Sequence, residues 1–114
     1  MMNIEIADIY IKMLIEDNDF DGKKFEMVVK MSGPLSYLHN DFESEAKVKN
    51  IEILRASLDG KELETDIREA IADEIRKNLF ALITICTNEE IKLDKDGLID
   101  IAYEVLADYC LLNK

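Results

Sequence analysis

The sequence predicts an α+β domain, in which two or three helices pack on one face of a small antiparallel sheet of two or three strands. Three observations lead to this prediction. The length of 114 residues suits a single domain spanning residues 1–114, and 48% of the residues are hydrophobic, as in ordinary globular proteins. Apolar residues alternate with polar ones in the first half, which indicates strands, and recur at helical spacing in the second half.

Glycine-containing turns divide the chain into five segments. The turn signals are Asp21-Gly22, Ser32-Gly33-Pro34, Asp59-Gly60 and Asp96-Gly97. Asp-Gly readily adopts the backbone angles at which a chain reverses direction. No repeat or low-complexity linker interrupts the segments, so nothing indicates a second domain.

The first segment, Ile4 to Glu16, has features of both helix and strand. Its polar residues fall on one narrow helical stripe, whereas the alternation from Ile9 to Ile15 and the isoleucine content suit a strand. We interpret it as a helix, with a third strand of the sheet as the alternative.

Two strands are predicted next. Phe25 to Met31 alternates as a half-buried strand that ends at Gly33-Pro34. Ala46 to Leu58 forms the second strand, and its apolar phase slips between Ile53 and Leu54, as a β-bulge requires. Too few residues separate the strands for a helical crossover, so we expect them to pair antiparallel.

Two helices are predicted in the second half. Asp59 and Glu62 form a variant of the capping box, which starts a helix that buries a row of residues four apart: Leu63, Ile67, Ile71 and Ile75. The last helix runs from about Leu98 to Leu112, and the residues expected in the core are Leu98, Ile101, Ala102, Val105, Tyr109 and Leu112. Between the helices, Leu79 to Cys86 is apolar on every side and should be buried.

The amino-acid composition limits the classes of partner that the protein is expected to bind. The formal net charge of -11 would repel nucleic acid phosphates and anionic lipid headgroups, so neither is an expected ligand. A protein with a basic patch suits the charge better. We expect a cytoplasmic protein, because no apolar run approaches the roughly 20 residues that cross a bilayer.

The two cysteines, Cys86 and Cys110, each lie in an apolar run and should pack in the core. They lack the spacing of a zinc or redox site, and no cofactor is expected.

Carboxylates recur every four residues in the last helix, at Asp96, Asp100, Glu104 and Asp108, and therefore share one face. No Lys or Arg occurs between Lys95 and Lys114 to offset them. The preceding helix carries a similar row, Glu62, Asp66, Glu69 and Asp73. There, pairs of Glu64 with Arg68 and of Asp73 with Lys77 should compensate part of the charge. We expect these acidic faces, and the last helix above all, to bind a basic partner.

The segment Asp17 to Gly22 resembles the first half of an EF-hand calcium loop. Asp17, Asp19 and Asp21 occupy the positions of the opening ligands, but Val28 stands where that family has a bidentate Glu. The resemblance implies at most weak calcium binding.

Catalytic patterns are sparse. The one histidine, His39, falls in a polar stretch from His39 to Glu45 that should be an exposed loop. No nucleophile elbow, phosphate loop or dinucleotide motif occurs, and we expect a protein without enzymatic activity.

The stretch from Phe25 to Glu74, with its motif Ser57-Leu-Asp-Gly-Lys-Glu-Leu63, resembles small acidic phage and mobile-element proteins of unknown function. The resemblance implies an accessory protein that binds or inhibits a bacterial host protein, such as a component of a defence system. A self-associating structural domain is the alternative, driven by apolar surface from Ile4 to Ile15 or from Leu79 to Ile85.

Overall fold

The computed structural model describes residues 3–88 and 90–112, and it is richer in strand than the sequence predicts. Strands account for 51% of the chain and helices for 30%. The strands are β1 (Asn3–Phe20), β2 (Lys23–His39), β3 (Ser44–Leu58), β4 (Lys61–Glu62), β5 (Ile83–Ile85) and β6 (Ile91–Leu93). The helices are α1 (Thr65–Lys77), α2 (Leu79–Leu82) and α3 (Lys95–Asp108).

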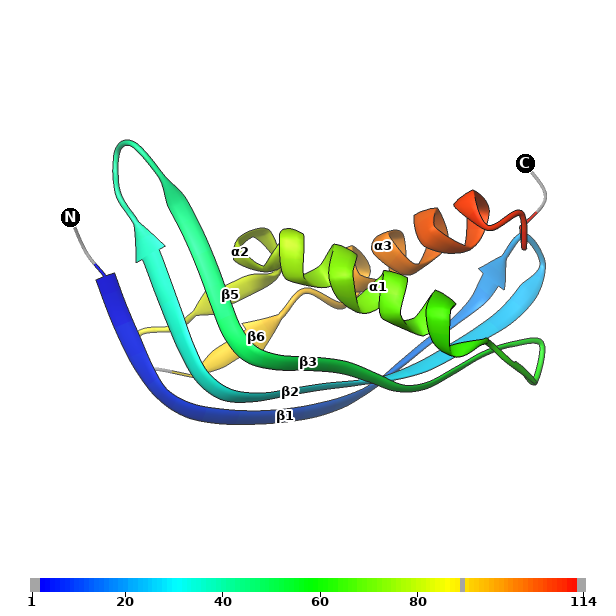
Figure 1. Cartoon of the computed structure of the whole chain (residues 1–114), viewed down its shortest axis with the longest axis horizontal. Helices are drawn as coiled ribbons and strands as arrows, with labels where there is room; N and C mark the ends of the chain where they lie inside the picture. Colours follow the sequence, from blue (N-terminus) through cyan, green and yellow to red (C-terminus); the bar gives the residue numbers. More distant parts are fainter. Residues whose placement is uncertain (1–2, 89, 113–114) are drawn as a thin grey trace.

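Four strands form an antiparallel sheet in the order β1-β2-β3-β4, and β5 and β6 form a separate two-stranded sheet. The long strands bend together, and the helices lie on the concave face of the bent sheet (Figure 1). α1 contacts β3 and α3, and α3 also contacts β1. The predicted α+β class with two or three strands is therefore wrong, since long β-hairpins dominate the fold.

The first segment forms strand β1, so its interpretation as a helix is wrong and the alternative, a strand in the sheet, is what the structure has. β1 pairs with β2 along nearly its whole length. Ile15 is buried, and Ile9, Ile11 and Met13 pack against the core. Helical and strand patterns coincide here, and pairing with β2 selects the strand.

Strand β2 continues through Gly33-Pro34, where the sequence predicted its end. Gly33 adopts φ +100°, and the register with β3 shifts between Ser32 and Leu35. A glycine is required at this point, because an added Cβ would lie 2.5 Å from the Cβ of Lys49 on β3. The irregularity interrupts the ladder without ending the strand.

The predicted β-bulge in the third strand is confirmed. Arg55 pairs with Val28 and Ile53 pairs with Val29, which leaves Leu54 as the extra residue. Leu54 is exposed, while Ile53 is buried in the core. The slip in apolar phase therefore marks a real change of register.

Two Asp-Gly pairs form tight hairpin turns. Asp21 and Gly22 have φ of 56° and 82°, and Asp59 and Gly60 have φ of 53° and 78°. The second turn connects β3 to β4, so Asp59 does not cap the following helix as predicted. Its carboxylate Oδ1 instead accepts the Lys24 N–H at 2.8 Å.

Helix α1 begins at Thr65 and buries Ile67, Ile71 and Ile75 of the predicted row. Leu63, the first residue of that row, is buried but precedes the helix. The predicted buried segment after it divides into α2 and β5. Leu79, Leu82 and Ile83 are buried, but Ala81 and Thr84 are exposed.

Helix α3 begins and ends earlier than predicted, at Lys95 and Asp108. The turn predicted at Asp96-Gly97 is therefore wrong, because both residues lie in the first turn of this helix. Leu98, Ala102, Val105 and Leu112 are buried as predicted, together with Leu106. The burial of Tyr109 was predicted wrongly, because this residue follows the last helical turn and is 44% exposed.

The core is apolar throughout the described residues, which bury no polar or charged residue. It joins the sheet to the helices, and the side chains that are buried completely include Phe20, Phe25, Met27, Ile71, Ile75, Leu98 and Leu106. Neither cysteine belongs to it: Cys86 is half-buried and Cys110 is exposed with φ 61°, which corrects the predicted core packing. None of the helices in the described segments has the length and apolarity needed to cross a membrane.

Candidate functional site

The acidic row of α3 lies on the protein surface as predicted. Asp96, Asp100, Glu104 and Asp108 are all exposed. The last three border a groove of about 280 Å³ between α3 and the end of α1, where Glu74 contributes a further carboxylate. The four-residue spacing on α3 and the carboxylate of Glu74 on α1 thus concentrate negative charge along one groove, which we call the α1–α3 groove.

This charge is not compensated by the part of the chain that the structure describes. No ion pair there involves a carboxylate of α3. The last turn of α3 carries no basic residue, although a helix C-terminus favours cations. Like charges four residues apart cost roughly 0.2–0.5 kcal/mol per pair. The row is therefore mildly unfavourable for folding, and a bound cationic group would relieve it.

The carboxylates of the preceding row are partly neutralised, but by other partners than predicted. Arg68 pairs with Glu62 at 3.8 Å, and Arg76 pairs with Asp73 at 2.6 Å. Asp66 and Glu69, the other two residues of that row, are exposed. Glu62 lies on β4, so only Asp66, Glu69 and Asp73 of the predicted row are on α1. This row is consequently the weaker acidic surface.

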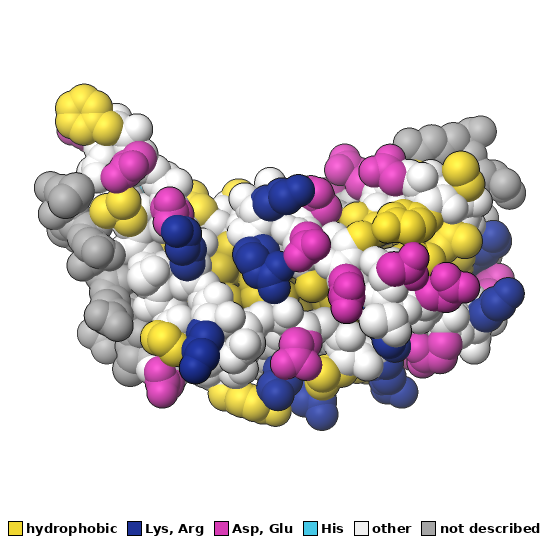
Figure 2. Space-filling view, in the orientation of Figure 1, with side chains coloured by type: hydrophobic (Ala, Val, Ile, Leu, Met, Phe, Trp, Pro, Cys, Tyr) yellow, Lys and Arg dark blue, Asp and Glu magenta, His cyan; other side chains and the backbone are white. Residues whose placement is uncertain are grey.

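An apolar groove opens where the acidic row ends. It has a volume of about 620 Å³ and is bordered by β4, the start of α1 and the residues after α3. Its apolar lining consists of Leu58, Leu63, Ile67, Tyr109 and Leu111, and Lys23, Asp59, Lys61, Glu62 and Glu64 complete it. Figure 2 shows apolar surface between carboxylates at this end of the molecule. We call it the Tyr109 groove.

Sequence reasoning missed the Tyr109 groove, because it predicted that Tyr109 is part of the core. The residues of the groove come from three separated segments, and only tertiary packing brings them together. The one local signal is Tyr109 itself, which follows the last turn of α3.

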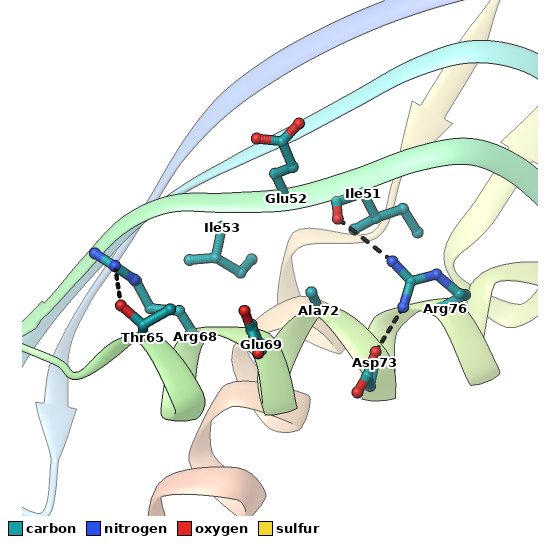
Figure 3. Close-up of a pocket in the computed structure, with 9 residues that line it drawn as sticks. All are labelled: Ile51, Glu52, Ile53, Thr65, Arg68, Glu69, Ala72, Asp73 and Arg76. Carbon is teal, nitrogen blue, oxygen red and sulfur yellow. Dashed lines mark hydrogen bonds and ion pairs between the residues drawn. The ribbon is translucent and has the colours of Figure 1, made fainter.

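A third groove, of about 360 Å³, separates α1 from β3 (Figure 3). Ile51, Ile53 and Ala72 line it, and Arg68 and Arg76 lie toward its two ends. Arg76 donates to the Ile51 carbonyl at 3.4 Å as well as to Asp73. These contacts join α1 to the sheet, and we assign them a structural role.

The three aspartates of the calcium-like segment serve the β1–β2 turn. Asp17 Oδ1 accepts the Asp19 N–H at 2.7 Å, and Asp19 Oδ1 accepts the Gly22 N–H at 3.3 Å. Within residues 3–88 and 90–112 no group of three or more metal-ligating side chains is placed to hold a metal. Calcium binding stays a prediction without structural support.

Asp21 is linked to α3. The Tyr103 hydroxyl donates to Asp21 Oδ1 at 2.7 Å. This hydrogen bond, reinforced by the nearby negative charges of Asp21 and Asp19, raises the pKa of Tyr103 above its ordinary value of 10.0.

The single histidine has a local partner. His39 Nδ1 lies 2.8 Å from Ser44 Oγ across the β2–β3 hairpin, and its ring is 5.4 Å from that of Phe80. Both His39 and Ser44 are exposed. These contacts connect the hairpin to α2 and give the histidine a structural role.

No protein-family model, curated protein or solved structure matches the chain.

Proposed function

We propose that the protein is a non-enzymatic binding module, which captures a segment of another protein that carries both basic and apolar side chains. The observation that supports this most directly is the row of Asp100, Glu104 and Asp108 along the α1–α3 groove, which forms no ion pair with any residue that the structure describes. Lysine or arginine side chains of a partner would supply the missing positive charge.

The Tyr109 groove supplies the second half of the proposed interface. Exposed ion pairs between carboxylates and basic side chains contribute little affinity in water, whereas burial of apolar surface contributes about 25 cal/mol per Å². Tyr109 is 44% exposed beside the half-buried Leu58 and Leu111, so an apolar side chain of the partner can bury surface there. The carboxylates then speed association and set the orientation.

The setting of this function follows the resemblance to small phage and mobile-element proteins. In that setting the protein acts in the cytoplasm, and its partner is a bacterial host protein that it inhibits or modulates. A component of a defence system fits this description. Neither nucleic acid nor an anionic membrane is a direct ligand of the acidic surface, because phosphates and anionic lipid headgroups repel carboxylates.

Charge reversal tests this function. The variant Asp100→Lys, Glu104→Lys, Asp108→Lys should lose capture of partners from a bacterial lysate, and of a synthetic peptide that combines lysine with leucine. High salt should weaken capture by the wild type, since these charges lie near the surface. Mass spectrometry of proteins lost from the variant identifies the partner, and direct titration measures its affinity.

A matched control distinguishes the effect of this site on capture from the effect of net charge. Asp41→Lys, Glu43→Lys, Glu52→Lys changes the same number of exposed carboxylates on the β2–β3 hairpin and β3. This control should keep the captured partner. Equal capture by the wild type and both variants would refute the acidic-face function, and equal loss in both variants would reduce it to a net-charge effect.

A further inference from the structure

Strand β1 is an open edge of the sheet. It is 18 residues long, and among the described residues β2 is its only neighbour in the strand order. An edge strand presents a row of backbone N–H and C=O groups that can pair with another strand. Tyr10 and Leu14 on β1 are 66% and 46% exposed, on the side where their cross-strand neighbours are Ser32 and Val28.

Two charged residues of β1 form no ion pair within the described chain. Asp8 and Lys12 are exposed, and neither forms an ion pair there. Lys12 lies directly opposite Lys30 of β2, and Asp8 lies opposite Pro34. Like charges directly opposed in a sheet are destabilising, so Lys12 would gain from an added carboxylate on its open side.

The residues on the two sides of Tyr10 match in polarity, but the charged residues have opposite signs. Reading outward from Tyr10, isoleucines follow on both sides at Ile9 and Ile11, and then Asp8 and Lys12. An antiparallel pair of two such strands, centred on Tyr10, would place each Asp8 opposite a Lys12. The segment from Asp8 to Lys12 is therefore complementary to itself.

We infer that β1 is the interface of a homodimer, in which it pairs antiparallel with β1 of a second copy about a twofold axis at Tyr10. Asp8 then faces the partner's Lys12 on the outer face of the sheet, and Ile9 faces the partner's Ile11 on the helix side. The two four-stranded sheets join into one continuous sheet. The backbone groups of the edge become satisfied, as burial requires.

The aromatic residue at the axis supports the same register. Tyr10 lies beside Lys30, whose Nζ is 5.7 Å from the ring centroid. In the dimer the two Tyr10 rings face each other across the axis, and aromatic cross-strand pairs contribute roughly 0.2–1 kcal/mol. The exposed ring thereby gains an apolar neighbour.

A second register also matches charges but fits less well. Centring the pair on Leu14 would place Lys12 opposite the partner's Glu16. It would, however, place Ile11 opposite the partner's Asp17. Both residues lie on the helix side of the sheet. Opposing an apolar residue with a carboxylate there is unfavourable. The register centred on Tyr10 opposes isoleucine with isoleucine.

Sedimentation velocity of the full chain at increasing protein concentration tests the dimer. The wild type should reach a dimer, while Asp8→Lys alone and Lys12→Asp alone should weaken dimerisation at least tenfold. A mixture of these two variants should recover a heterodimer, and the double variant Asp8→Lys, Lys12→Asp should recover the homodimer. Only complementary charge pairs across the twofold axis would account for all four results.

Controls distinguish the register and the fold. Glu16→Lys should leave dimerisation unchanged, since Glu16 has no charged partner in the Tyr10-centred register. All variants are exposed substitutions and should keep the circular dichroism and thermal midpoint of the monomeric unit. A wild type that stays monomeric at every concentration overturns the proposal, as does dimerisation that the single charge variants leave unchanged. Loss through Glu16→Lys but not through Asp8→Lys overturns the register. The acidic groove of α3 is a separate surface, so failure here leaves the proposed binding function untouched.

Discussion

The Tyr103 hydroxyl donates a 2.7 Å hydrogen bond to Asp21 Oδ1, and this contact joins α3 to a hairpin turn 82 residues earlier in the chain. Beneath it, the Tyr103 ring meets Phe20 edge-on at 5.3 Å, and Phe20 stacks on Phe25 at 4.4 Å. This aromatic cluster therefore fixes the end of the molecule at which the Tyr109 groove opens.

Stability should fall at alkaline pH in a way that depends on Tyr103. Its pKa is raised in the folded protein, so its contribution is complete below the unfolded pKa near 10.0 and is lost as pH rises through the higher folded value. Tyr103→Phe keeps the ring but removes the hydroxyl. The difference in unfolding free energy between wild type and Tyr103→Phe should be largest below pH 10 and shrink above it, as measured by urea titration.

Asp21→Asn serves as the control for this pH dependence. Asn-Gly is a favoured pair in such turns, so the hairpin should persist while the carboxylate is lost. The pKa of Tyr103, followed by its ultraviolet absorbance, should then move back toward its ordinary value. An unchanged tyrosine titration would show that Asp21 does not raise the pKa of Tyr103.

Truncation of the aromatic cluster should be costly. Phe20 is completely buried, and Phe20→Ala should lower the unfolding free energy by about 3–5 kcal/mol. Phe42→Ala is the matched control, because Phe42 is 96% exposed in the β2–β3 hairpin loop and should change stability by less than about 0.5 kcal/mol. Chemical denaturation of both variants checks this. Similar losses of unfolding free energy in the two variants would contradict the burial of Phe20 in the core.

The glycine in the interrupted strand should resist substitution more than a turn glycine. Gly33→Ala meets both an unfavourable φ and the Cβ of Lys49, and should cost about 2–4 kcal/mol. Gly60→Ala has open space around it, so only its φ of 78° opposes the change, at a cost of about 1–2 kcal/mol. Equal thermal midpoints for the two variants would exclude the close approach of β2 to β3.

The charge row on α3 should reduce stability in a salt-dependent way. Asp108 lies in the last turn, where negative charge opposes the helix dipole and Glu104 is one turn away. Asp108→Lys should therefore stabilise the protein by roughly 0.5–1 kcal/mol at low salt, and less in concentrated salt. Thermal unfolding at two ionic strengths measures the effect, and destabilisation by this change would show that Asp108 has a favourable contact.

The two halves of the proposed interface should differ in their response to salt. Tyr109→Ala should weaken capture of the lysine-leucine peptide severalfold and leave its salt dependence intact, because it removes apolar surface only. The triple lysine variant of α3 should lose the salt dependence itself. Calorimetric titration at two salt concentrations separates these effects, and an unchanged affinity for Tyr109→Ala would remove the Tyr109 groove from the interface.

Several local features follow directly from the order of residues. The bulge at Leu54 appears as a slip in apolar phase, and the Asp-Gly pairs at Asp21 and Asp59 predict turns because few other residues tolerate positive φ. The exposed acidic face of α3 follows from spacing alone, since residues four apart share one side of a helix.

Other features depend on partners distant in the chain. Ile4 to Glu16 suits either helix or strand by its own pattern, and the β2 neighbour decides between them. By its sequence, Gly33 indicates the end of a strand. Only the tertiary structure shows that the strand continues and that Lys49 lies beside the glycine. The first error replaced a strand with a helix and the second shortened a strand, so both lowered the predicted strand content.

The sequence by itself determined the turns at Asp21-Gly22 and Asp59-Gly60, the bulge, the inward faces of α1 and α3 and the row of carboxylates, because each depends on neighbours within a few residues. Tertiary structure alone decided that the first segment is an edge strand, that the α3 row borders α1, and that Tyr109 lies open beside Leu63 and Ile67. Sheet pairing and helix packing join residues far apart in the chain, and their free energy exceeds the small local preferences that a sequence pattern records.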